Sequence, residues 1–321
     1  MTEAGAPARW SRIVVVANPN AGAKAGLPTN RSGGDVVREA LERHGLEAEI
    51  VEGADEDEAR RLARAAAADG ADLVVAAGGD GTVGLVASEL LETGVALGIL
   101  PLGSVMNIAR SLGVPRDLDA AVRILTEGEP RAVDVGEVNG EPFYEAGTVG
   151  LNAALFREAA QVDAGHFAGL WHALKVLFRF RPARMRITLD DGVIRDRALM
   201  VVAANGPYTG FGFTVAPDAL LDDGRFDVCI FSRFSRTELV RHFVSIAVGR
   251  RAYSPKVRVK RSAYVRVDAY RRLPCRADSV DHGATPVEFS VRPRALRVVV
   301  PRPAADEAAA QPAERPALKG H

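Results

Sequence analysis

The residue types best suited to chemistry in this chain lie in the run Gly78-Gly79-Asp80-Gly81-Thr82. This run follows an apolar stretch, residues 73–77, and precedes a stretch with helical periodicity, residues 83–91. Glycines let the backbone come close to an anion, and the N-terminus of a helix presents unpaired N–H groups to it. The run therefore predicts a phosphate-binding turn between a strand and a helix.

Asp80 is the residue of this turn that requires a cation, because a carboxylate repels bare phosphate. A divalent cation or its bound waters, placed between the carboxylate and a nucleotide, would turn that repulsion into attraction. The sequence therefore predicts a metal-linked nucleotide at Asp80. The alternative is a glycine-rich turn in which Asp80 only caps the helix behind it.

Strand and helix patterns alternate from residue 11 to about residue 134. Strands are expected at 13–17, 46–51, 73–77 and 96–100, and helices at 35–44, 55–68, 83–91, 106–112 and 118–127. Such alternation predicts an α/β fold with a parallel sheet covered on both faces. Ligands of these sheets bind beyond the carboxyl ends of the strands. Three turns fall there: Asn18-Pro19-Asn20-Ala21-Gly22, the Gly78 run and Pro101-Leu102-Gly103-Ser104.

Short β patterns dominate after residue 133. Strands are expected at 132–138, 143–149, 185–189, 198–204, 226–231, 257–259, 263–267, 287–291 and 296–300, with helices at 164–180 and 236–248. Many short strands joined by Gly/Asp turns predict an antiparallel β-sandwich or barrel-like domain, with the active site in the cleft between domains. We expect a nucleotide-binding domain over 10–134, a β-rich domain over 135–303 and a disordered tail over 304–321.

Composition narrows the class of protein. The chain has 321 residues, of which 47% are hydrophobic, enough to bury a sizeable core. Lys+Arg and Asp+Glu both number 41, so the overall charge favours no class of partner. Cys229 and Cys275 match no metal spacing and are expected to be reduced core thiols. Neither a secretory signal nor a run of about 20 apolar residues is found, so we expect a cytoplasmic protein that can still bind a membrane surface.

The motifs, taken in order, resemble the diacylglycerol kinase catalytic-domain family, which contains bacterial lipid kinases and is related to sphingosine kinases. The Gly-Gly-Asp-Gly element alone also resembles NAD kinases and phosphofructokinases, so the whole series carries the resemblance. Its members are Asn18-Pro19, Gly78 to Thr82, Gly98 to Gly103, Asn107 with Ala109-Arg110, Leu112 to Pro115, Asp134 to Gly136, Gly147 to Gly150, Asn205-Gly206, Ala216-Pro217, Asp222 to Gly224, Thr285-Pro286 and Leu296 to Pro301.

The resemblance implies transfer of the ATP γ-phosphoryl group to a lipid hydroxyl, with diacylglycerol favoured. It assigns ATP binding to Asn18, Gly78, Gly79, Asp80, Gly81, Thr82, Ser104 and Asn107. Asp80 would also help to hold catalytic Mg²⁺. A second, structural Mg²⁺ is implied at Asp223, with the backbone oxygens of Leu220 and Arg225; an ordinary Asp-Gly hairpin turn is the equal alternative there.

Two departures from the family pattern concern catalysis. The family's Gly-Thr-Gly-Asn-Asp segment is Gly103-Ser104-Val105-Met106-Asn107-Ile108 here, which keeps a hydroxyl and an Asn but lacks one glycine and a carboxylate. The family's Asp-Gly-Glu is Asp278-Ser279-Val280. The general base is therefore Asp278, Asp281 or a water that either one holds. A catalytically degenerate lipid- or nucleotide-binding relative and a NAD kinase-type metabolite kinase remain as alternatives.

Two further segments bear on partners. Residues 241–266 contain eight Lys and Arg and no acidic residue, a pattern that suits anionic lipid headgroups or, alternatively, a solvated strand face. No recognition motif for nucleic acid accompanies them, so nucleic acid is not expected. Residues 166–180 are amphipathic, as in a core helix or a lining for acyl chains. The oligomeric state stays open, a homodimer included.

Overall fold

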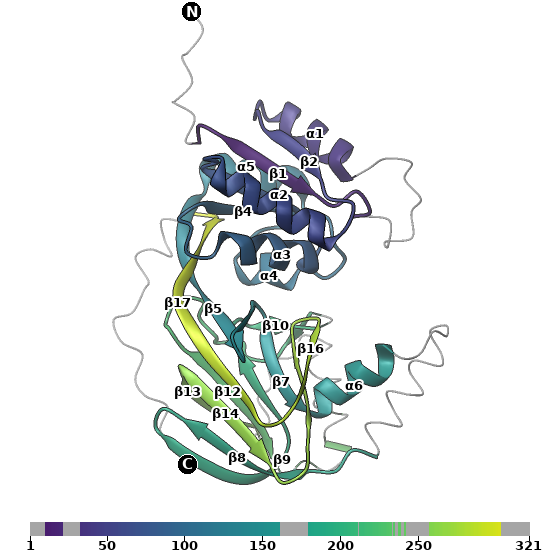
Figure 1. Ribbon diagram of the computed structural model, residues 1–321, viewed down its shortest axis with the longest axis vertical. Coiled ribbons are helices and arrows are strands. Elements are labelled where there is room, and N and C mark those ends of the chain that lie inside the picture. Colours follow the sequence, from purple (N-terminus) through teal and green to yellow (C-terminus); the bar gives the residue numbers. More distant parts are fainter. Residues whose placement is uncertain are drawn as a thin grey trace, which may run out of the picture.

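The computed structural model describes residues 10–21, 33–160, 179–210, 212–232, 234, 237–238, 241 and 257–302. One 15-stranded sheet runs through both halves of the chain (Figure 1). Its main path has the order β16-β15-β7-β9-β8-β14-β17-β4-β3-β1-β2. No helix of the described residues is long and apolar enough to cross a membrane.

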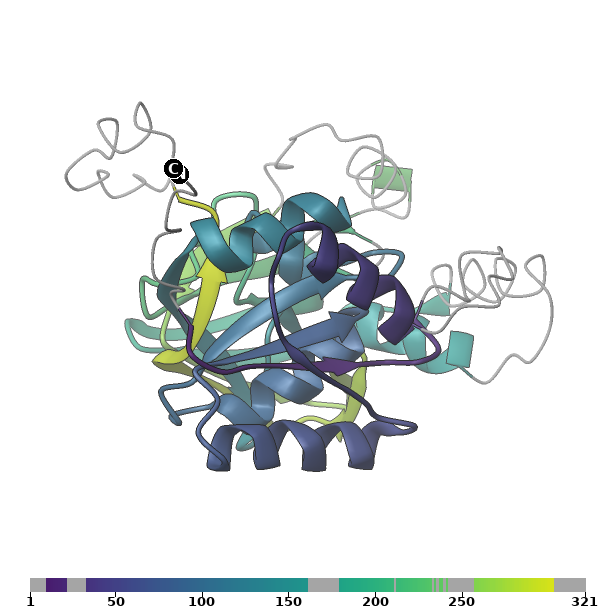
Figure 2. The same ribbon diagram turned by 90° about the horizontal axis from the view of Figure 1, so that it is seen from above.

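The N-terminal half is a parallel sheet between helices. Its strands pair in the order β2 (Glu49–Glu52), β1 (Ile13–Ala17), β3 (Leu73–Gly78) and β4 (Ala96–Pro101). In the view from above, α1 (Gly33–Arg43) and α5 (Leu118–Glu127) lie over one face and α2 (Glu56–Ala68) over the other (Figure 2). All residues of β1, β3 and β4 are buried, which explains their uninterrupted apolar sequences.

Two aspartates cap the N-termini of helices in this half. Asp55 accepts a hydrogen bond from Glu58 N at 2.8 Å and caps α2, and Asp117 accepts one from Ala120 N at 2.8 Å and caps α5. α3 (Asp80–Leu90) is the element after β3, and α4 (Asn107–Ser111) is the element after β4. The predicted α/β arrangement is confirmed.

The C-terminal half is rich in antiparallel strands. They are β5 (Glu129–Val138), β6 (Glu141–Phe143), β7 (Ala146–Gly150), β8 (Ala183–Leu189), β9 (Gly192–Ala204), β10 (Tyr208–Thr209), β11 (Phe213–Thr214), β12 (Phe226–Ser232), β13 (Val257–Ser262), β14 (Tyr264–Ala269), β15 (Pro274–Ala277), β16 (Val280–Ala284) and β17 (Val287–Val300). α6 (Leu151–Ala160) follows β7. The core includes Phe143, whose ring stacks on Phe226 at 5.6 Å and meets the edge of Phe289 at 6.1 Å.

β17 joins the two halves. It pairs antiparallel with β14 and β5, and its later residues pair parallel with β4, Arg297 opposite Ala96 and Val298 opposite Leu97. The sequence predicted two strands here; the structure has one, with an irregularity in its pairing with β5 between Arg292 and Leu296. The last strand of the described chain is therefore part of the sheet that carries the Gly78 turn.

Other differences from the sequence analysis concern the C-terminal half. The strand predicted at 143–149 is interrupted at Tyr144-Glu145, between β6 and β7. β15 and β16 were not predicted. The helices predicted at 164–180 and 236–248 lie outside the described residues except for a few single positions, and the predicted tail lies outside them entirely. Cys229 and Cys275 are buried free thiols, as expected.

Candidate active site

A cavity of about 550 Å³ opens where the three predicted turns meet. Its lining includes Asn18, Gly79 to Thr82, Leu102 to Val105 and Arg116. Six of the eight residues predicted to bind nucleotide therefore reach it: Asn18, Gly79, Asp80, Gly81, Thr82 and Ser104. Gly78 and Asn107 do not line it. All lining residues come from the N-terminal half, whereas the sequence analysis expected a cleft between two domains.

The loops of Gly79 and Gly103, which both line the cavity, pack closely against each other. A Cβ placed on Gly103 would lie 2.6 Å from Gly79 Cα and 2.8 Å from Met106 Sδ, so Gly103 is required for this contact. A Cβ on Gly79 would meet only Gly103 Cα at 3.7 Å, an ordinary contact, and the Gly79 backbone is extended, with φ −87°. Gly78 packs against Thr82. A Cβ placed on Gly78 would lie 2.4 Å from Thr82 Oγ1.

These contacts predict different outcomes for two alanine variants. Gly103→Ala should destabilise the fold by about 1–3 kcal/mol, because backbone atoms of the Gly79 loop must move. Gly79→Ala should leave the melting temperature nearly unchanged and weaken ATP binding, because its methyl group takes up space in the cavity. Thermal melting and calorimetric ATP titration separate the two. Equal melting temperatures for both variants would contradict the packing described above.

Asp80 is fixed by the helix that follows β4. Its Oδ2 accepts a hydrogen bond from Asn107 N at 3.0 Å and its Oδ1 accepts one from Ile108 N at 2.9 Å. The N-cap of α3 is Gly79, which makes no side-chain cap bond. The alternative that Asp80 caps its own helix is therefore wrong. Asp80 lines the cavity, and its carboxylate is oriented by the first two amides of α4.

Asn107 links the two halves of the chain. It is 1% exposed, and its Nδ2 donates hydrogen bonds to Glu145 Oε2 at 2.9 Å and to Gly210 O at 2.8 Å. Its Oδ1 is buried and accepts no hydrogen bond. Asn107 therefore connects the loop of Asp80 to the C-terminal half, a position different from the nucleotide contact that the family resemblance implies.

Glu145 is a buried carboxyl group that the sequence analysis missed. Its Oε2 accepts hydrogen bonds from Asn107 Nδ2 and from Gly210 N, the latter at 3.2 Å. Burial, followed by the charges of Asp278 and Asp80, raises the pKa of Glu145 to about 9. The group is therefore protonated at neutral pH. An acidic residue inside an apolar strand pattern was the available signal in the sequence.

The raised pKa predicts how Glu145 affects stability. The unfolded chain releases this proton near the ordinary value of 4.5, whereas the folded chain keeps it to about 9. Stability from this group is complete below pH 4.5 and is lost as pH rises towards 9. Glu145→Gln has no proton to release and avoids this loss. The melting temperature of the variant minus that of the wild type should therefore increase by at least about 2 °C from pH 5 to pH 8.5. A constant difference would contradict the assignment; Glu47→Gln is the exposed control.

Asp278 lies in the turn between β15 and β16, with φ 48°. Its carboxylate accepts hydrogen bonds from three successive backbone amides, Tyr144 N at 2.7 Å, Glu145 N at 2.9 Å and Ala146 N at 3.2 Å. Burial raises the pKa of Asp278 to about 6, against the lowering effect of these bonds, and the charge of Asp80 adds to the rise. Asp80, Glu145 and Asp278 thus lie within electrostatic reach of one another.

The motif position Val280 and the alternative base Asp281 both lie on the surface. Val280, where the family has Glu, begins β16 and is 52% exposed. Asp281 is exposed and accepts a hydrogen bond from Gly283 N at 2.7 Å. Of the two carboxylates Asp278 and Asp281, Asp278 is therefore the one that contacts Glu145.

Asp223 has the geometry of a turn residue. Its Oδ1 accepts a hydrogen bond from Arg225 N at 3.0 Å, and burial raises its pKa. The buried Asp134 holds the turn by accepting bonds from Gly224 N at 2.6 Å and Arg294 N at 2.8 Å. No group of three or more His, Cys, Asp or Glu suited to a metal occurs in the part of the chain that the structure describes.

Both halves of this architecture match known domain families. Residues 12–138 match the diacylglycerol kinase catalytic domain, and residues 147–300 match the YegS C-terminal NAD kinase beta sandwich-like domain. A diacylglycerol kinase of Mycobacterium tuberculosis is 30% identical over 301 residues, covering 91% of this chain and 96% of the relative. The diacylglycerol kinase of Bacillus subtilis is 28% identical over 256 residues, covering 78% and 84%.

A solved structure shows the same fold. A crystal structure of a diacylglycerol kinase from Bacillus anthracis superimposes with a TM-score of 0.69 and 19% identity, covering 91% of this chain and 97% of that one. The order of the motifs, the two matched domains and the similar relatives all indicate the same family. The chain belongs to the diacylglycerol kinase family.

Proposed function

We propose that this protein is an ATP-dependent lipid kinase that transfers the γ-phosphoryl group of ATP to a lipid hydroxyl, with diacylglycerol as the favoured acceptor. The observation that carries the proposal is the connection from the cavity to two carboxyl groups, the buried Glu145 and the half-buried Asp278. Asp80 lines the cavity and bonds to the amide of Asn107; Asn107 bonds to Glu145, and the Glu145 amide bonds to Asp278.

The cavity suits the phosphates of a nucleotide. Gly79 and Gly81 leave the N-terminus of α3 open to the cavity, and Asn18, Thr82 and Ser104 add polar side chains. Arg116, which the sequence analysis missed, adds a cation to the lining, and its Nη2 donates to Gly103 O at 3.4 Å. Phosphoryl transfer depends mainly on positioning and charge neutralisation, which these groups supply.

Arg116 can be tested directly. Arg116→Ala should raise the KM for ATP about tenfold, because a charge-assisted hydrogen bond to phosphate is lost. The matched control is Arg123→Ala on the exposed surface of α5, which should leave the KM unchanged. Steady-state kinetics at saturating lipid measures both. An unchanged KM for Arg116→Ala would remove this residue from the nucleotide site.

A divalent cation fits beside Asp80. Mg²⁺ in kinases is held by one or two carboxylates together with substrate phosphates, and Asp80 supplies one carboxylate within the cavity. When bound, Mg²⁺ would neutralise charge that develops on the phosphates. We also propose the structural Mg²⁺ at Asp223 with the backbone oxygens of Leu220 and Arg225. A rise in melting temperature with Mg²⁺, lost in Asp223→Asn, would support it.

Asp278 is the proposed acceptor of the proton from the attacking hydroxyl. A pKa of about 6 leaves it mostly ionised at neutral pH, and Glu145 beside it stays protonated. Two neighbouring carboxyl groups with separated pKa values suit a base and a neutral hydrogen-bonding partner. The carboxylate missing at Val280 is therefore not required for a base.

One assay tests the proposal. Radiolabelled ATP is offered with a panel of lipid alcohols in mixed micelles, and NAD serves as the control acceptor. Transfer to a lipid alcohol is expected. Transfer to NAD would favour the metabolite-kinase alternative, and ATP binding without transfer to any acceptor would favour the degenerate relative. We further propose a cytoplasmic protein that contacts the inner membrane face, since its acceptor resides in a membrane.

A further inference from the structure

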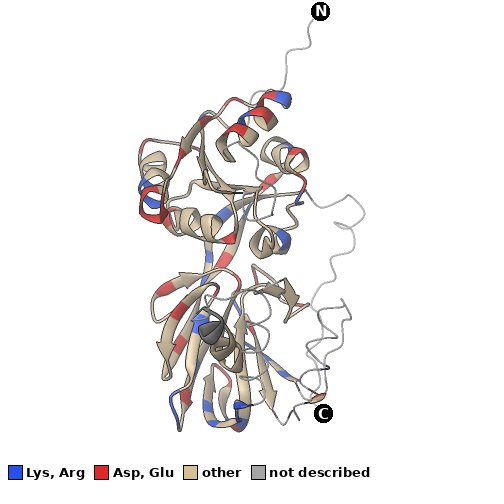
Figure 3. Ribbon diagram, turned by 90° about the vertical axis from the view of Figure 1, so that its right-hand side faces the viewer, with Lys and Arg blue, Asp and Glu red and all other residues tan. Residues whose placement is uncertain are grey.

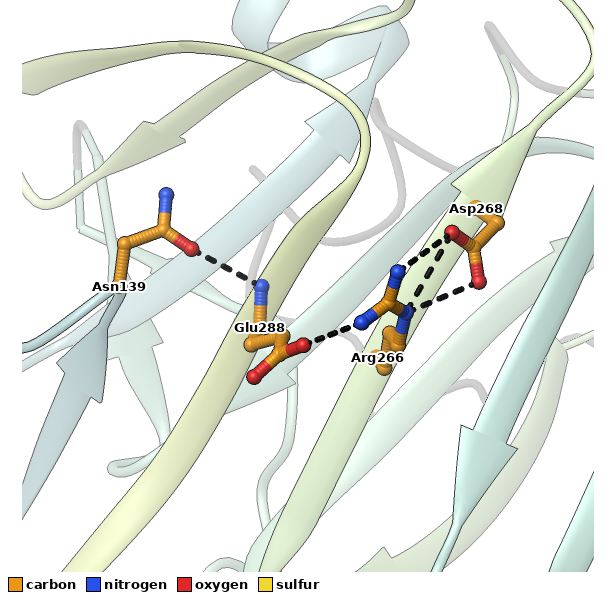
Figure 4. A network of polar contacts seen from close by, with 4 residues as sticks. All are labelled: Asn139, Arg266, Asp268 and Glu288. Atoms are coloured by element: carbon orange, nitrogen blue, oxygen red, sulfur yellow. Dashed lines mark hydrogen bonds and ion pairs between the residues drawn. The ribbon is translucent and has the colours of Figure 1, made fainter.

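The basic stretch that the sequence singled out is largely neutralised where the structure describes it. Arg258 pairs with Asp196 at 3.9 Å, Lys260 with Asp191 at 3.5 Å and Arg261 with Asp227 at 3.1 Å. Figure 4 shows Arg266 between the carboxylates of Asp268 and Glu288, with the Glu288 amide donating to Asn139 Oδ1 at 3.1 Å. These cations are therefore poor candidates for binding an external anion.

A different set of cations lacks such partners. Arg184 on β8 is directly opposite Arg197 on β9, and Arg186 is directly opposite Arg195. All four side chains are exposed, and the four residues form what we term the arginine face. No ion pair of the described residues involves any of them. Like charges directly opposite one another across a sheet destabilise the pairing. On its other side Arg186 is opposite Asp268 of β14, whose carboxylate is bonded by Arg266.

The surroundings of the arginine face are open and have few free carboxylates. A hollow of about 590 Å³ is lined by these arginines together with Asp196, Asp268 and Tyr270. Asp268 is bonded by Arg266, and Asp196 accepts a hydrogen bond from Ser232 Oγ at 2.9 Å. Both carboxylates therefore already have partners of their own.

Tyr270 adds an apolar component to this surface. Its side chain is 96% exposed, and its backbone amide donates to Arg184 O at 3.1 Å, which fixes it next to the arginine face. Exposed tyrosines are enriched where protein meets the headgroup region of a bilayer. β8 and β9 lie at the end of the molecule away from β1 and β2, and blue segments mark this end of the strands (Figures 1 and 3).

We propose that the arginine face and Tyr270 form the surface by which this protein binds an anionic lipid membrane. Guanidinium groups pair with lipid phosphates, and the tyrosine ring lies at the headgroup boundary. The proposal rests on the proposed function in one respect, that a lipid kinase must meet its acceptor at a membrane. The choice of occupant rests on charge complementarity combined with an exposed aromatic ring, which a soluble polyanion would not need.

Vesicle sedimentation tests the surface without ATP or turnover, so failure of the kinase assignment does not affect it. The wild type should bind vesicles of phosphatidylcholine with phosphatidylglycerol, bind phosphatidylcholine alone weakly, and lose affinity as salt rises. Arg184→Gln/Arg186→Gln should weaken binding to the anionic vesicles about 25-fold, from about fivefold for each cation. The matched control Arg61→Gln/Arg64→Gln removes two exposed, ion-paired cations from α2 in the N-terminal half and should bind like the wild type.

Further readouts distinguish a loss of surface charge from a loss of fold. The arginine variant should melt no lower than the wild type, because a like-charge contact is relieved. Tyr270→Ser should weaken vesicle binding with little change in its salt dependence. Binding by Arg184→Gln/Arg186→Gln equal to that of the wild type would overturn the proposal. So would wild-type binding to a soluble polyanion such as heparin with no binding to anionic vesicles.

Discussion

Replacing Asp80 by Asn is expected to lower kcat by about 10²- to 10³-fold, because the carboxylate that would hold a divalent cation beside the reacting phosphates is lost. The fold should survive. Asn at this position can accept from only one of the two α4 amides, Asn107 N or Ile108 N, so a cost of about 1–2 kcal/mol in stability is expected. Activity at saturating Mg²⁺ and thermal melting are the two measurements.

Asp117→Ala, which removes a helix cap, is the matched control for Asp80→Asn. Asp117 also caps a helix through its carboxylate, with Ala120 N at 2.8 Å, but it does not line the cavity. A similar loss of stability with normal kcat is expected for it. Near wild-type turnover of Asp80→Asn at saturating Mg²⁺ would contradict the cation-linked role and leave Asp80 as the residue that fixes α4.

The N-terminal half was predictable because its signals are local. β1, β3 and β4 are buried along their whole length, so they appear in the sequence as continuous apolar runs. α5 has the predicted bounds, 118–127, because Asp117 marks its start and its apolar positions are periodic. β2 was predicted less accurately, since this edge strand is only half-buried and its sequence is Glu-Ile-Val-Glu.

The C-terminal half depends more on contacts between distant segments. β16 has the sequence Val-Asp-His-Gly-Ala and is mostly exposed, so it lacks the alternation that identifies a strand. It exists because it pairs with β15, which in turn pairs with β7. The break between β6 and β7 has the same origin: the amides at 144–146 bond to the Asp278 carboxylate instead of to a strand.

The candidate site also has a part that could be predicted from the sequence and a part that could not. The Gly78 to Thr82 turn and Ser104 follow strands whose carboxyl ends meet at one edge, so their position follows from the sequence. Glu145 could not be placed in that way, because its partners Asn107 and Asp278 are 38 and 133 residues away. The sequence therefore located the turns that line the cavity and named Asp278, and the structure was needed to identify Glu145 and to show that it lies beside Asp278.

Asp278→Asn is the second variant with a large expected effect. If Asp278 accepts the proton of the attacking hydroxyl, kcat should fall by about 10²- to 10⁴-fold with little change in the KM for ATP, because the group acts only as the hydroxyl attacks. The wild-type rate should rise as pH increases through about 6, where Asp278 ionises, and the variant should lack this rise.

Structure and chemistry are separated by two controls for Asp278→Asn. The Asn side chain turns an NH₂ group towards one of the three amides that bind the carboxylate, so melting curves and ATP titration must show that the variant folds and binds nucleotide. Asp281→Asn removes a carboxylate three residues further on, at the exposed edge strand, and should keep the wild-type pH profile. If Asp278→Asn folds, binds ATP and retains kcat, Asp278 is not the base.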